Sequence, residues 1–366
     1  MEIETHKSTG PQASNAKTKM QKTIDLGVEF WNDSCGLSEL QDAVDNGATG
    51  ATSNPVIVLG AVKADPKTWT PVIDQFVSEN PHATEDEIAW LLIEDLGRKA
   101  AKILEPIHKR SGGAQGYLSM QVNPKYYRDP NRMFDHGVRL AQLAPNIAIK
   151  APATLEGIEA MEKLVAHGIN VNATVSFSVS QAIAIAEAFE RGLDKAERAG
   201  KGGSHLHPYV TIMVGRIDDH MQRTLTKEAI TVDPGICHWA GVAVYKRAYQ
   251  IFKTRGYRAI LLAAAYRHQM HWSELIGTDN VQTIPYSWWK QFNNSDISPR
   301  LSLEEPLSPS ILAQLHGKFG EFRKAYDEFG LQPSEFGRYG ATLHTLNQFL
   351  AGYQDLLGIV RERMIR

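Results

Sequence analysis

The chain has 366 residues with 39 basic and 41 acidic side chains, so its formal net charge at neutral pH is -2. This balance, without a block rich in lysine and arginine, argues against nucleic acid or an anionic membrane as partner and favours a small-molecule ligand. Cys35 and Cys237 are too few for a disulfide framework or a thiolate metal site, which suits a reducing compartment. No stretch reaches the roughly 18 apolar residues of a membrane span, so we expect a cytoplasmic protein.

The first 24 residues are polar and rich in Lys, Thr and Ser, and are expected to form an N-terminal tail. From residue 25, short runs rich in β-branched residues alternate with amphipathic helical patterns, which indicates βα units and a parallel sheet with both faces covered. Eight strands are predicted, at 27–33, 48–53, 116–122, 146–151, 170–176, 208–214, 258–265 and 281–286. Helical patterns between them cover 38–45, 85–109, 155–166, 178–191 and 238–254.

Eight βα units close naturally into a barrel, so the expected fold class for residues 25–366 is α/β, a single (β/α)8 TIM barrel domain. No G-x-G-x-x-G run follows the first strand and no P-loop occurs, which argues against a dinucleotide-binding open sheet. Residues 197–207 contain three glycines and are expected to form a surface loop. From 291 to 366 we expect a helical extension, with helices near 308–328 and 344–364, that packs on the barrel or on a second copy in a homodimer.

A lysine ends the fourth predicted strand, in the run Ile147-Ala-Ile-Lys150-Ala-Pro-Ala-Thr154. A buried ammonium is costly unless it is paired or gives up its proton, so a lysine in this setting tends to have a lowered pKa and to act as a nucleophilic amine. This is the chemistry of a Schiff-base enzyme. The alternative is a lysine just past the strand end with its ammonium in water.

Active sites of α/β barrels lie at the carboxyl ends of the strands, so polar residues at those ends are the candidates for chemistry. They are Asp33, Thr52, Ser53, Asn54, Gln121, Lys150, Asn172, Thr174, Ser176, Thr211, Arg216 and Arg267. Each also has a structural explanation when it is considered alone. Asp33 and Asn54 could cap a helix or open a turn, and the two arginines could form solvated ion pairs.

Taken together, the strings at these strand ends resemble the transaldolase family of Schiff-base enzymes, over roughly residues 25–290. The matching strings, in order, are Phe30-Trp-Asn-Asp33, Gly50-Ala-Thr-Ser-Asn-Pro55, Ile149-Lys150-Ala-Pro-Ala-Thr154, Glu156-Gly-Ile158, Gly168-Ile-Asn-Val-Asn172-Ala-Thr174, Phe177-Ser-Val-Ser-Gln181 and Val214-Gly-Arg216. The lysine string and the Asn/Thr string are the most specific of these. Their common order makes a chance similarity improbable.

The resemblance implies a (β/α)8 fold and transfer of a dihydroxyacetone unit between ketose and aldose phosphates of the pentose phosphate pathway, with neither a metal nor an organic cofactor. Lys150 would form the iminium that accepts electrons when a carbon–carbon bond breaks, and Asp33 would act as the general acid–base. Thr174 and Gln121 would orient the relay water. The remaining implied substrate-binding residues are Thr52, Ser53, Asn54, Asn172, Ser176, Thr211, Arg216 and Arg267, with the hydroxyl of Thr211 between the two phosphate-binding arginines.

Gln121 departs from the pattern of typical transaldolases, in which the third strand ends in a glutamate that shares the relay water. Related fructose 6-phosphate aldolases carry a glutamine here, so an aldolase-like cleavage of the donor is the alternative reaction. Thr211 stands where a serine is usual, and Met213 replaces the usual aromatic residue. Asp33 fits the transaldolase pattern, and we therefore predict a transaldolase.

A metal-dependent hydrolase is the alternative from another class. Its binuclear site would use His205, His207, His268, Asp33 and a carbamylated Lys150. The first two histidines stand at the start of the sixth predicted strand, on the barrel face opposite the chemistry, which argues against this site. The pair His268 and His271 is expected to lie on an ordinary loop or helix surface, and a barrel that serves as a non-catalytic scaffold is a further alternative.

Overall fold

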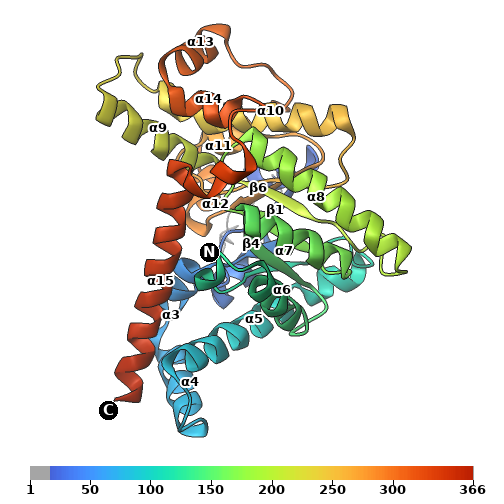
Figure 1. Cartoon of the computed structure of the whole chain (residues 1–366), viewed down its shortest axis with the longest axis vertical. Coiled ribbons are helices and arrows are strands. Elements are labelled where there is room, and N and C mark those ends of the chain that lie inside the picture. Colours follow the sequence, from blue (N-terminus) through green and yellow to red (C-terminus); the bar gives the residue numbers. More distant parts are fainter. Residues whose placement is uncertain (1–16, 366) are drawn as a thin grey trace, which may run out of the picture.

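The computed structural model describes residues 17–365, and its centre is a closed barrel of eight parallel strands (Figure 1). Each strand pairs with the next one along the chain, and the last pairs with the first. The strands are β1 (Val28–Asn32), β2 (Gly50–Thr52), β3 (Leu118–Gln121), β4 (Ile147–Pro152), β5 (Val171–Thr174), β6 (Tyr209–Ile212), β7 (Ile260–Ala263) and β8 (Asn280–Ile284). The predicted (β/α)8 TIM barrel is confirmed, and each strand end lies within two residues of its expected position.

Helices connect the strands and cover the outside of the barrel. They are α1 (Lys19–Asp25), α2 (Leu37–Asp45), α3 (Pro55–Ala64), α4 (Pro66–Glu79), α5 (Glu85–Arg110), α6 (Pro130–Ala141), α7 (Leu155–Ala166), α8 (Val179–Arg198), α9 (Val214–Glu228), α10 (Ala240–Arg255), α11 (Met270–Ser273), α12 (Tyr286–Asn293), α13 (Pro309–Lys318), α14 (Gly320–Tyr326) and α15 (Gly340–Met364). Three 3-10 segments are η1 (Pro124–Tyr126), η2 (Ile236–Trp239) and η3 (Pro333–Arg338). The five helices expected between strands are present, and α8 extends into the range that was expected to be a surface loop.

Side-chain caps fix where several helices begin. The hydroxyl of Thr84 accepts the backbone N–H of Glu87, whose carboxylate accepts the N–H of Thr84, so α5 starts with a complete capping box. The hydroxyl of Thr154 likewise accepts the N–H of Gly157 at the start of α7. Because Thr154 follows β4 so closely, the cap also fixes the path of the chain just beyond Lys150.

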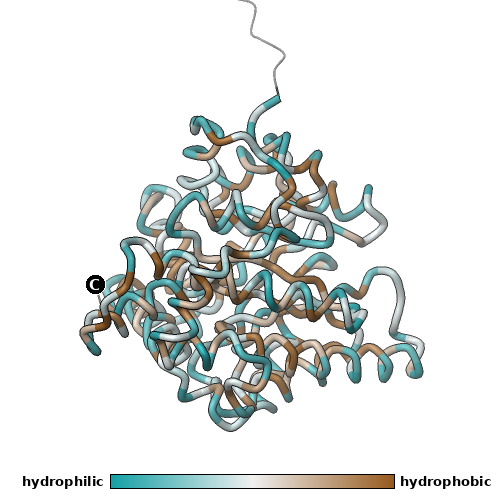
Figure 2. Tube along the Cα trace, turned by 90° about the horizontal axis from the view of Figure 1, so that it is seen from above, coloured by the Kyte–Doolittle hydropathy of each residue, from teal (hydrophilic) through white to brown (hydrophobic). Residues whose placement is uncertain are grey.

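Aromatic residues fill the barrel interior, with Tyr117 and Tyr209 at the starts of their strands. Trp31 and Tyr209 meet edge to face with ring centroids 4.8 Å apart, and Tyr117 and Val281 join the same buried cluster. A Cβ on Gly50 would come within 2.4 Å of the Trp31 ring, so only glycine fits at this position. Figure 2 shows the apolar residues concentrated in the interior of the molecule. The polar residues of the candidate site lie toward the opposite, carboxyl ends of the strands.

The C-terminal extension packs on the barrel of its own chain. The long helix α15 runs beside α3 and also contacts α4, α5 and α9 (Figure 1). Arg361 forms a bidentate pair with Glu85 at 2.6 Å, and the Tyr353 hydroxyl donates to Asp86 at 2.8 Å. These contacts fix the second half of α15, so its first half is held near the carboxyl ends of the strands.

A helix precedes the expected domain boundary at residue 25. Residues 1–16 of the expected polar tail lie outside the described residues, whereas residues 19–25 form α1. Thr18 and Gln21 make a capping box, and Trp272 donates from its indole N–H to the buried Thr23 hydroxyl at 3.0 Å. Within residues 17–365, none of the helices combines the length and the apolar character needed to cross a bilayer.

Candidate active site

Lys150 lies inside the barrel near the end of β4, level with Gln121 on β3 and Asn172 on β5. Only 4% of its surface is exposed, so the alternative with an ammonium in water is wrong. Among the described residues, its Nζ donates one hydrogen bond, a long one of 3.5 Å, to the carbonyl oxygen of Ser53. An amine with so little compensation for its lost hydration is destabilised in the charged form.

The charges around Lys150 have opposing effects on its pKa. Burial lowers the pKa of Lys150, the carboxylate of Asp33 partly opposes this effect, and the guanidinium of Arg216 lowers the pKa further. Asp33 follows β1 directly, and its carboxylate accepts a hydrogen bond from the hydroxyl of Thr52 at 2.5 Å. It does not cap α2, whose N-cap is Gly36. The capping role considered for Asp33 therefore does not apply, and its carboxylate acts on the Lys150 amine by raising its pKa.

Asn54 and Ser53 make structural bonds. The Asn54 side-chain oxygen accepts the backbone N–H groups of Val56 and Ile57 at 2.9 and 3.0 Å, and so caps α3. The Ser53 hydroxyl donates to the carbonyl of Ser119 at 3.1 Å. The capping alternative for Asn54 is thus realised, and its amide nitrogen, which takes part in neither bond, is the group left for a ligand.

A chain of hydrogen bonds fixes the orientation of Asn172. The Thr211 hydroxyl on β6 donates to its Oδ1 at 2.6 Å, and its Nδ2 donates to the Ser119 hydroxyl on β3 at 3.0 Å. The Thr211 hydroxyl thus acts on Asn172, and its contact with a phosphate between the two arginines stays a prediction. Ser119 was missed, although it lies two residues before Gln121 and strand alternation puts the two side chains on one face.

Several buried polar atoms at the candidate site have no hydrogen-bond partner among the described residues. They are Oε1 of Gln121, Oγ of Ser176 and Nε of Arg216. The Thr174 hydroxyl has only a 3.9 Å contact, to the sulfur of Met213. Native proteins bury few such groups, so three in one predicted site indicate positions that a polar ligand would fill.

Arg216 lies in the first turn of α9, because β6 ends at Ile212 before the predicted strand end. Its Nη1 donates to the side chains of Thr345 and Gln348 on α15, and its guanidinium lies over the ring of Phe349. Burial lowers the pKa of Arg216 to about 10, and the nearby Arg267 adds to this effect. Sequence patterns did not connect α15 with this site, since no strand-end rule covers a helix so far along the chain.

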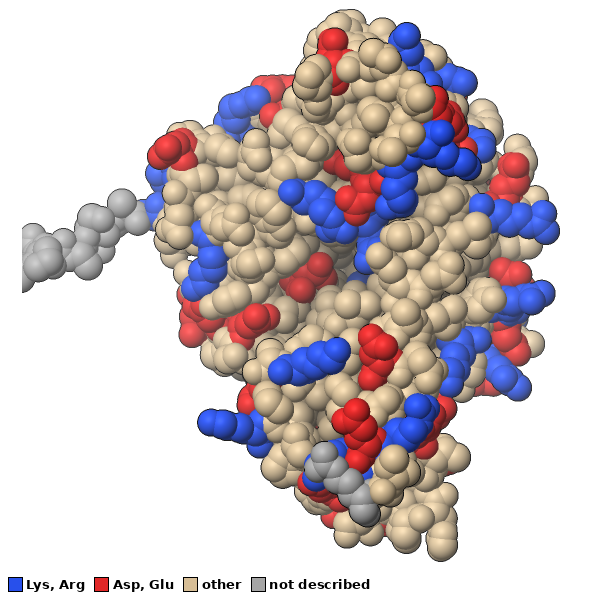
Figure 3. Space-filling view, turned by 90° about the vertical axis from the view of Figure 1, so that its left-hand side faces the viewer, with Lys and Arg blue, Asp and Glu red and all other residues tan. Residues whose placement is uncertain are grey.

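Arg267 is already paired. Its Nε and Nη2 both contact Asp219, at 3.0 and 2.9 Å, and its Nη1 donates to the carbonyls of Ala265 and Tyr266. Figure 3 shows basic side chains, with acidic ones among them, around a hollow in the middle of the face it presents. The ion-pair alternative considered for Arg267 is thus realised, whereas Arg216 retains an unpaired donor.

The proposed binuclear metal site is not formed. The backbone of His205 accepts hydrogen bonds from Tyr117 and Asn170, and the His207 N–H donates to Asn170, so both histidines lie at the starts of the strands. They are therefore far along the barrel from Asp33 and Lys150 at the strand ends. The expectation that His271 lies on a surface is also wrong, because its exposed fraction is 0%.

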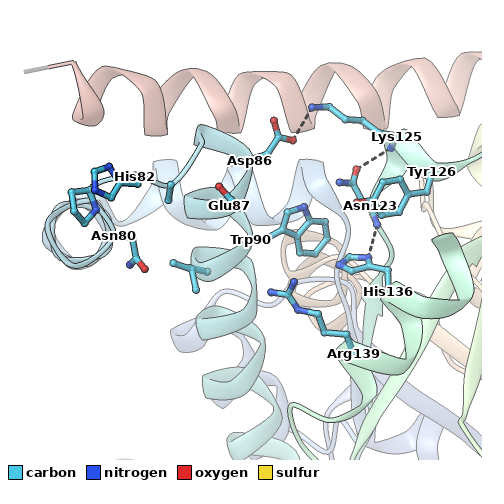
Figure 4. Close-up of a pocket in the computed structure, with 13 residues that line it drawn as sticks. Asn80, His82, Asp86, Glu87, Trp90, Asn123, Lys125, Tyr126, His136 and Arg139 are labelled. Carbon is cyan, nitrogen blue, oxygen red and sulfur yellow. Dashed lines mark hydrogen bonds and ion pairs between the residues drawn. The ribbon is translucent and has the colours of Figure 1, made fainter.

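Figure 4 shows a separate pocket of about 760 Å³ between the turn that links α4 and α5 and the segment after β3. Its polar groups bind one another. Lys125 pairs with Asp86 at 2.7 Å, and the Asn123 N–H donates to His136 at 3.1 Å. Burial lowers the pKa of His136 to about 4. The Asp86–Lys125 pair and the His136–Asn123 bond are satisfied internally, and the indole N–H of Trp90 is the buried lining group without a partner among the described residues, against three such atoms at the candidate site.

Comparisons with known proteins agree with the geometry. The model of the family described as Transaldolase/Fructose-6-phosphate aldolase matches residues 30–321. A Transaldolase of Thiobacillus denitrificans is 28% identical over 91% of this chain and 96% of that protein. The Transaldolase of Thermobifida fusca is 28% identical over 73% of this chain and 79% of its own length, and that of Neisseria meningitidis serogroup C is 29% identical, over 73% and 81%.

A pair of substitutions tests whether Lys150 is an uncompensated buried amine. Lys246 is also 4% exposed, but its Nζ donates to the carbonyls of Ser302 and Glu305 at 2.8 and 2.9 Å. Lys150→Met should raise the melting temperature at pH 7, by about 1–1.5 °C for each kcal/mol of desolvation cost that it removes from a chain of this length. Lys246→Met should lower it, because the buried carbonyl of Ser302 and the part-buried carbonyl of Glu305 lose their donor.

The gain in melting temperature from Lys150→Met should decrease as the pH rises. A lowered pKa in the folded state means that the unfolded chain binds more protons at pH values below 10.5, so the wild type becomes more stable as pH rises toward that value. The advantage of Lys150→Met should therefore shrink between neutral pH and pH 10.5 in thermal scans. A loss of stability equal to that of Lys246→Met would show that Lys150 is structurally paired.

Proposed function

The chain belongs to the transaldolase/fructose-6-phosphate aldolase family, and we propose that it transfers a dihydroxyacetone unit between ketose and aldose phosphates through a Schiff base on Lys150. It is an enzyme, a transferase of the transaldolase type. The observation that carries the proposed mechanism is the burial of the Lys150 amine with one weak hydrogen bond. Such an amine has a lowered pKa, and its neutral form is a nucleophile.

In the proposed reaction the Lys150 amine attacks the ketose carbonyl, and loss of water gives an iminium. The Asp33 carboxylate takes the proton of the C4 hydroxyl while the C3–C4 bond breaks, and the electron pair of that bond moves into the iminium to give an enamine. The aldose phosphate leaves, and an acceptor aldose phosphate reverses these steps. The bond from Thr52 supports this role, because it orients the Asp33 carboxylate without neutralising it.

The substrates are proposed to be sugar phosphates, such as sedoheptulose 7-phosphate with glyceraldehyde 3-phosphate. Asn172, fixed by two hydrogen bonds, and the free amide nitrogen of Asn54 would hold the dihydroxyacetone hydroxyls. The unpaired Nε of Arg216 would bind the phosphate. Thr52, Ser53 and Ser176 would line the cavity, and Thr174 with Gln121 would hold the relay water. We propose a cytoplasmic enzyme, which the unpaired and buried thiols suit.

Gln121 favours a second candidate, a fructose 6-phosphate aldolase-like cleavage without an acceptor. Its amide is buried at the end of β3, beside Lys150 in the register of the sheet, and its Oε1 lacks a partner. An amide can orient a water molecule but cannot accept its proton. The two candidates share the Schiff base and differ in the fate of the enamine.

Chemical trapping tests the Schiff base directly. Sodium borohydride added with fructose 6-phosphate should attach a dihydroxyacetone-derived group to Lys150, located by peptide mass spectrometry. Lys246, equally buried but hydrogen-bonded, is the internal control and should stay unmodified. Lys150→Met should abolish turnover, since no other group can replace the covalent electron sink. An active preparation labelled at another lysine, or at none, would remove the proposed mechanism.

Substitution of the arginines tests phosphate binding. Arg216→Ala should raise KM for fructose 6-phosphate. The loss of binding free energy should be the about 1.5–3 kcal/mol typical of a charge-assisted hydrogen bond. KM for dihydroxyacetone, measured with glyceraldehyde as acceptor, should change little. Arg267→Ala should raise KM less, because that guanidinium is paired with Asp219. An equal loss for phosphorylated and unphosphorylated donors would mean that Arg216 is structural.

Substitution of Gln121 separates transfer from cleavage. Gln121→Glu should raise the rate with an aldose phosphate acceptor relative to the rate without one, and should shift the pH profile, because a second carboxylate couples to Asp33. Gln121→Met, which adds no charge, should leave the profile in place. Asp33→Asn should cost about 10²–10⁴-fold in kcat. Unchanged rates and an unchanged profile in Gln121→Glu would place this residue outside the relay.

A further inference from the structure

Asp218, His268 and His271 form a buried cluster beside the candidate phosphate site. Asp218 is on α9, two residues after Arg216, and the histidines follow β7 just after Arg267. One oxygen of Asp218, Oδ2, lies 2.8 Å from Nε2 of both histidines, and the histidine rings lie 3.8 Å apart between centroids. The other oxygen accepts the backbone N–H of Gly241 at 2.8 Å.

These three residues have the composition of a metal site, since their ligand atoms lie within 4.8 Å of one another. The bond on the far side of the His271 ring excludes this use. Its Nδ1 faces the backbone N–H of Arg267 at 3.0 Å, and a peptide N–H can only donate. Nδ1 must therefore be unprotonated, so the neutral ring carries its proton on Nε2, where a metal would need a lone pair.

The same bond restricts the charge of His271. A second proton on the ring would sit on Nδ1 and face the Arg267 N–H, so the bond requires a neutral imidazole. Burial lowers the pKa of His271 and outweighs the opposing effect of Asp218, which agrees with this requirement. The neutral ring thus donates to Asp218 and accepts from Arg267, and links α9 to the loop after β7.

That loop needs a restraint. Ala265 has a φ of 65°, a left-handed conformation that is strained for a residue with a Cβ. The loop also packs directly on α9, because a Cβ on Gly215 would lie 2.1 Å from the Ala265 carbonyl oxygen and 2.6 Å from Cγ of Arg267. A shift of the loop would therefore move the first turn of α9, which carries Arg216.

We propose that Asp218 and His271 are positioning residues that lock the loop after β7 onto α9 and so hold Arg216 where it binds the substrate phosphate. His268 adds a second donor to the same carboxylate. This inference rests on the proposed function for the identity of the ligand. It assigns the cluster a hydrogen-bonding role and no metal.

Two substitutions of His271 separate its two bonds. His271→Asn places a side-chain oxygen near the position of Nδ1, where it can accept the Arg267 N–H, although it cannot reach Asp218. His271→Gln places an amide nitrogen near Nε2, where it can donate to Asp218, but leaves the Arg267 N–H without an acceptor. His205→Gln, at the strand starts and exposed, is the matched control.

The readouts are KM and kcat for fructose 6-phosphate and for dihydroxyacetone, with glyceraldehyde as acceptor, and the affinity for inorganic phosphate by calorimetry. His271→Gln should raise KM for fructose 6-phosphate about tenfold, which corresponds to about 1.4 kcal/mol of binding free energy. It should weaken phosphate binding by a similar factor. The kcat for dihydroxyacetone should stay within twofold of the wild-type value. His271→Asn should lose a similar amount of affinity, because it keeps the Arg267 bond but breaks the link to Asp218 on α9, and His205→Gln should match the wild type. An equal loss for both donors, or no loss in His271→Gln, would overturn the proposal.

Nitrogen NMR of the wild-type imidazoles provides a test that needs no turnover. His271 should show the tautomer with the proton on Nε2. A proton on Nδ1, or one tightly bound zinc per chain after dialysis against zinc, would overturn the assignment. Because phosphate affinity and the tautomer do not depend on the Schiff base, failure of borohydride trapping alone would refute the proposed function and leave this inference standing.

Discussion

The arrangement of the candidate site follows from the burial of one amine, that of Lys150, with almost no compensation. A charged ammonium at this position has lost its water and gained one long hydrogen bond from Nζ to a carbonyl. The environment therefore favours the neutral form, which is the form that attacks a carbonyl. The nearby charges act on the same equilibrium. Asp33 limits how far the pKa falls, and Arg216 adds to the decrease while offering a place for a phosphate.

The candidate site and the loops around it contain unpaired polar groups and strained backbone, both of which cost stability. Val175 and Ala265, at the ends of β5 and β7, have φ values of 57° and 65°, which residues with a Cβ rarely adopt. Backbone also packs closely on backbone at the end of β4, since a Cβ on Gly157 would lie 1.8 Å from the carbonyl oxygen of Pro152. Gly157, in the string Glu156-Gly-Ile158, is therefore required by the packing of the backbone. It lets α7 start directly against the end of β4.

The sequence correctly predicted the barrel and the end of the barrel at which the candidate site lies, because both depend on local patterns. The period of apolar residues locates strands, and the strand-end rule then places Asp33, Gln121, Lys150 and Asn172 at one end of the barrel. The strand-end rule does not predict which hydrogen-bond or ion-pair partner each side chain has. Thr211 binds Asn172 and not an arginine, and Arg267 binds Asp219. The contribution of α15 to Arg216 and the burial of His271 were also missed, since both arise from contacts between segments far apart in the chain.

The most direct test of the account is a measurement of the Lys150 pKa in the resting enzyme. The chain labelled with ¹³C and ¹⁵N at lysine would be titrated by NMR, and the Lys150 signal identified by its loss in Lys150→Met. The account predicts that this signal titrates below 10.5, the ordinary value for a lysine, whereas the exposed lysines titrate near it. A Lys150 signal that titrates at or above 10.5 would contradict the claim that burial makes this amine the nucleophile.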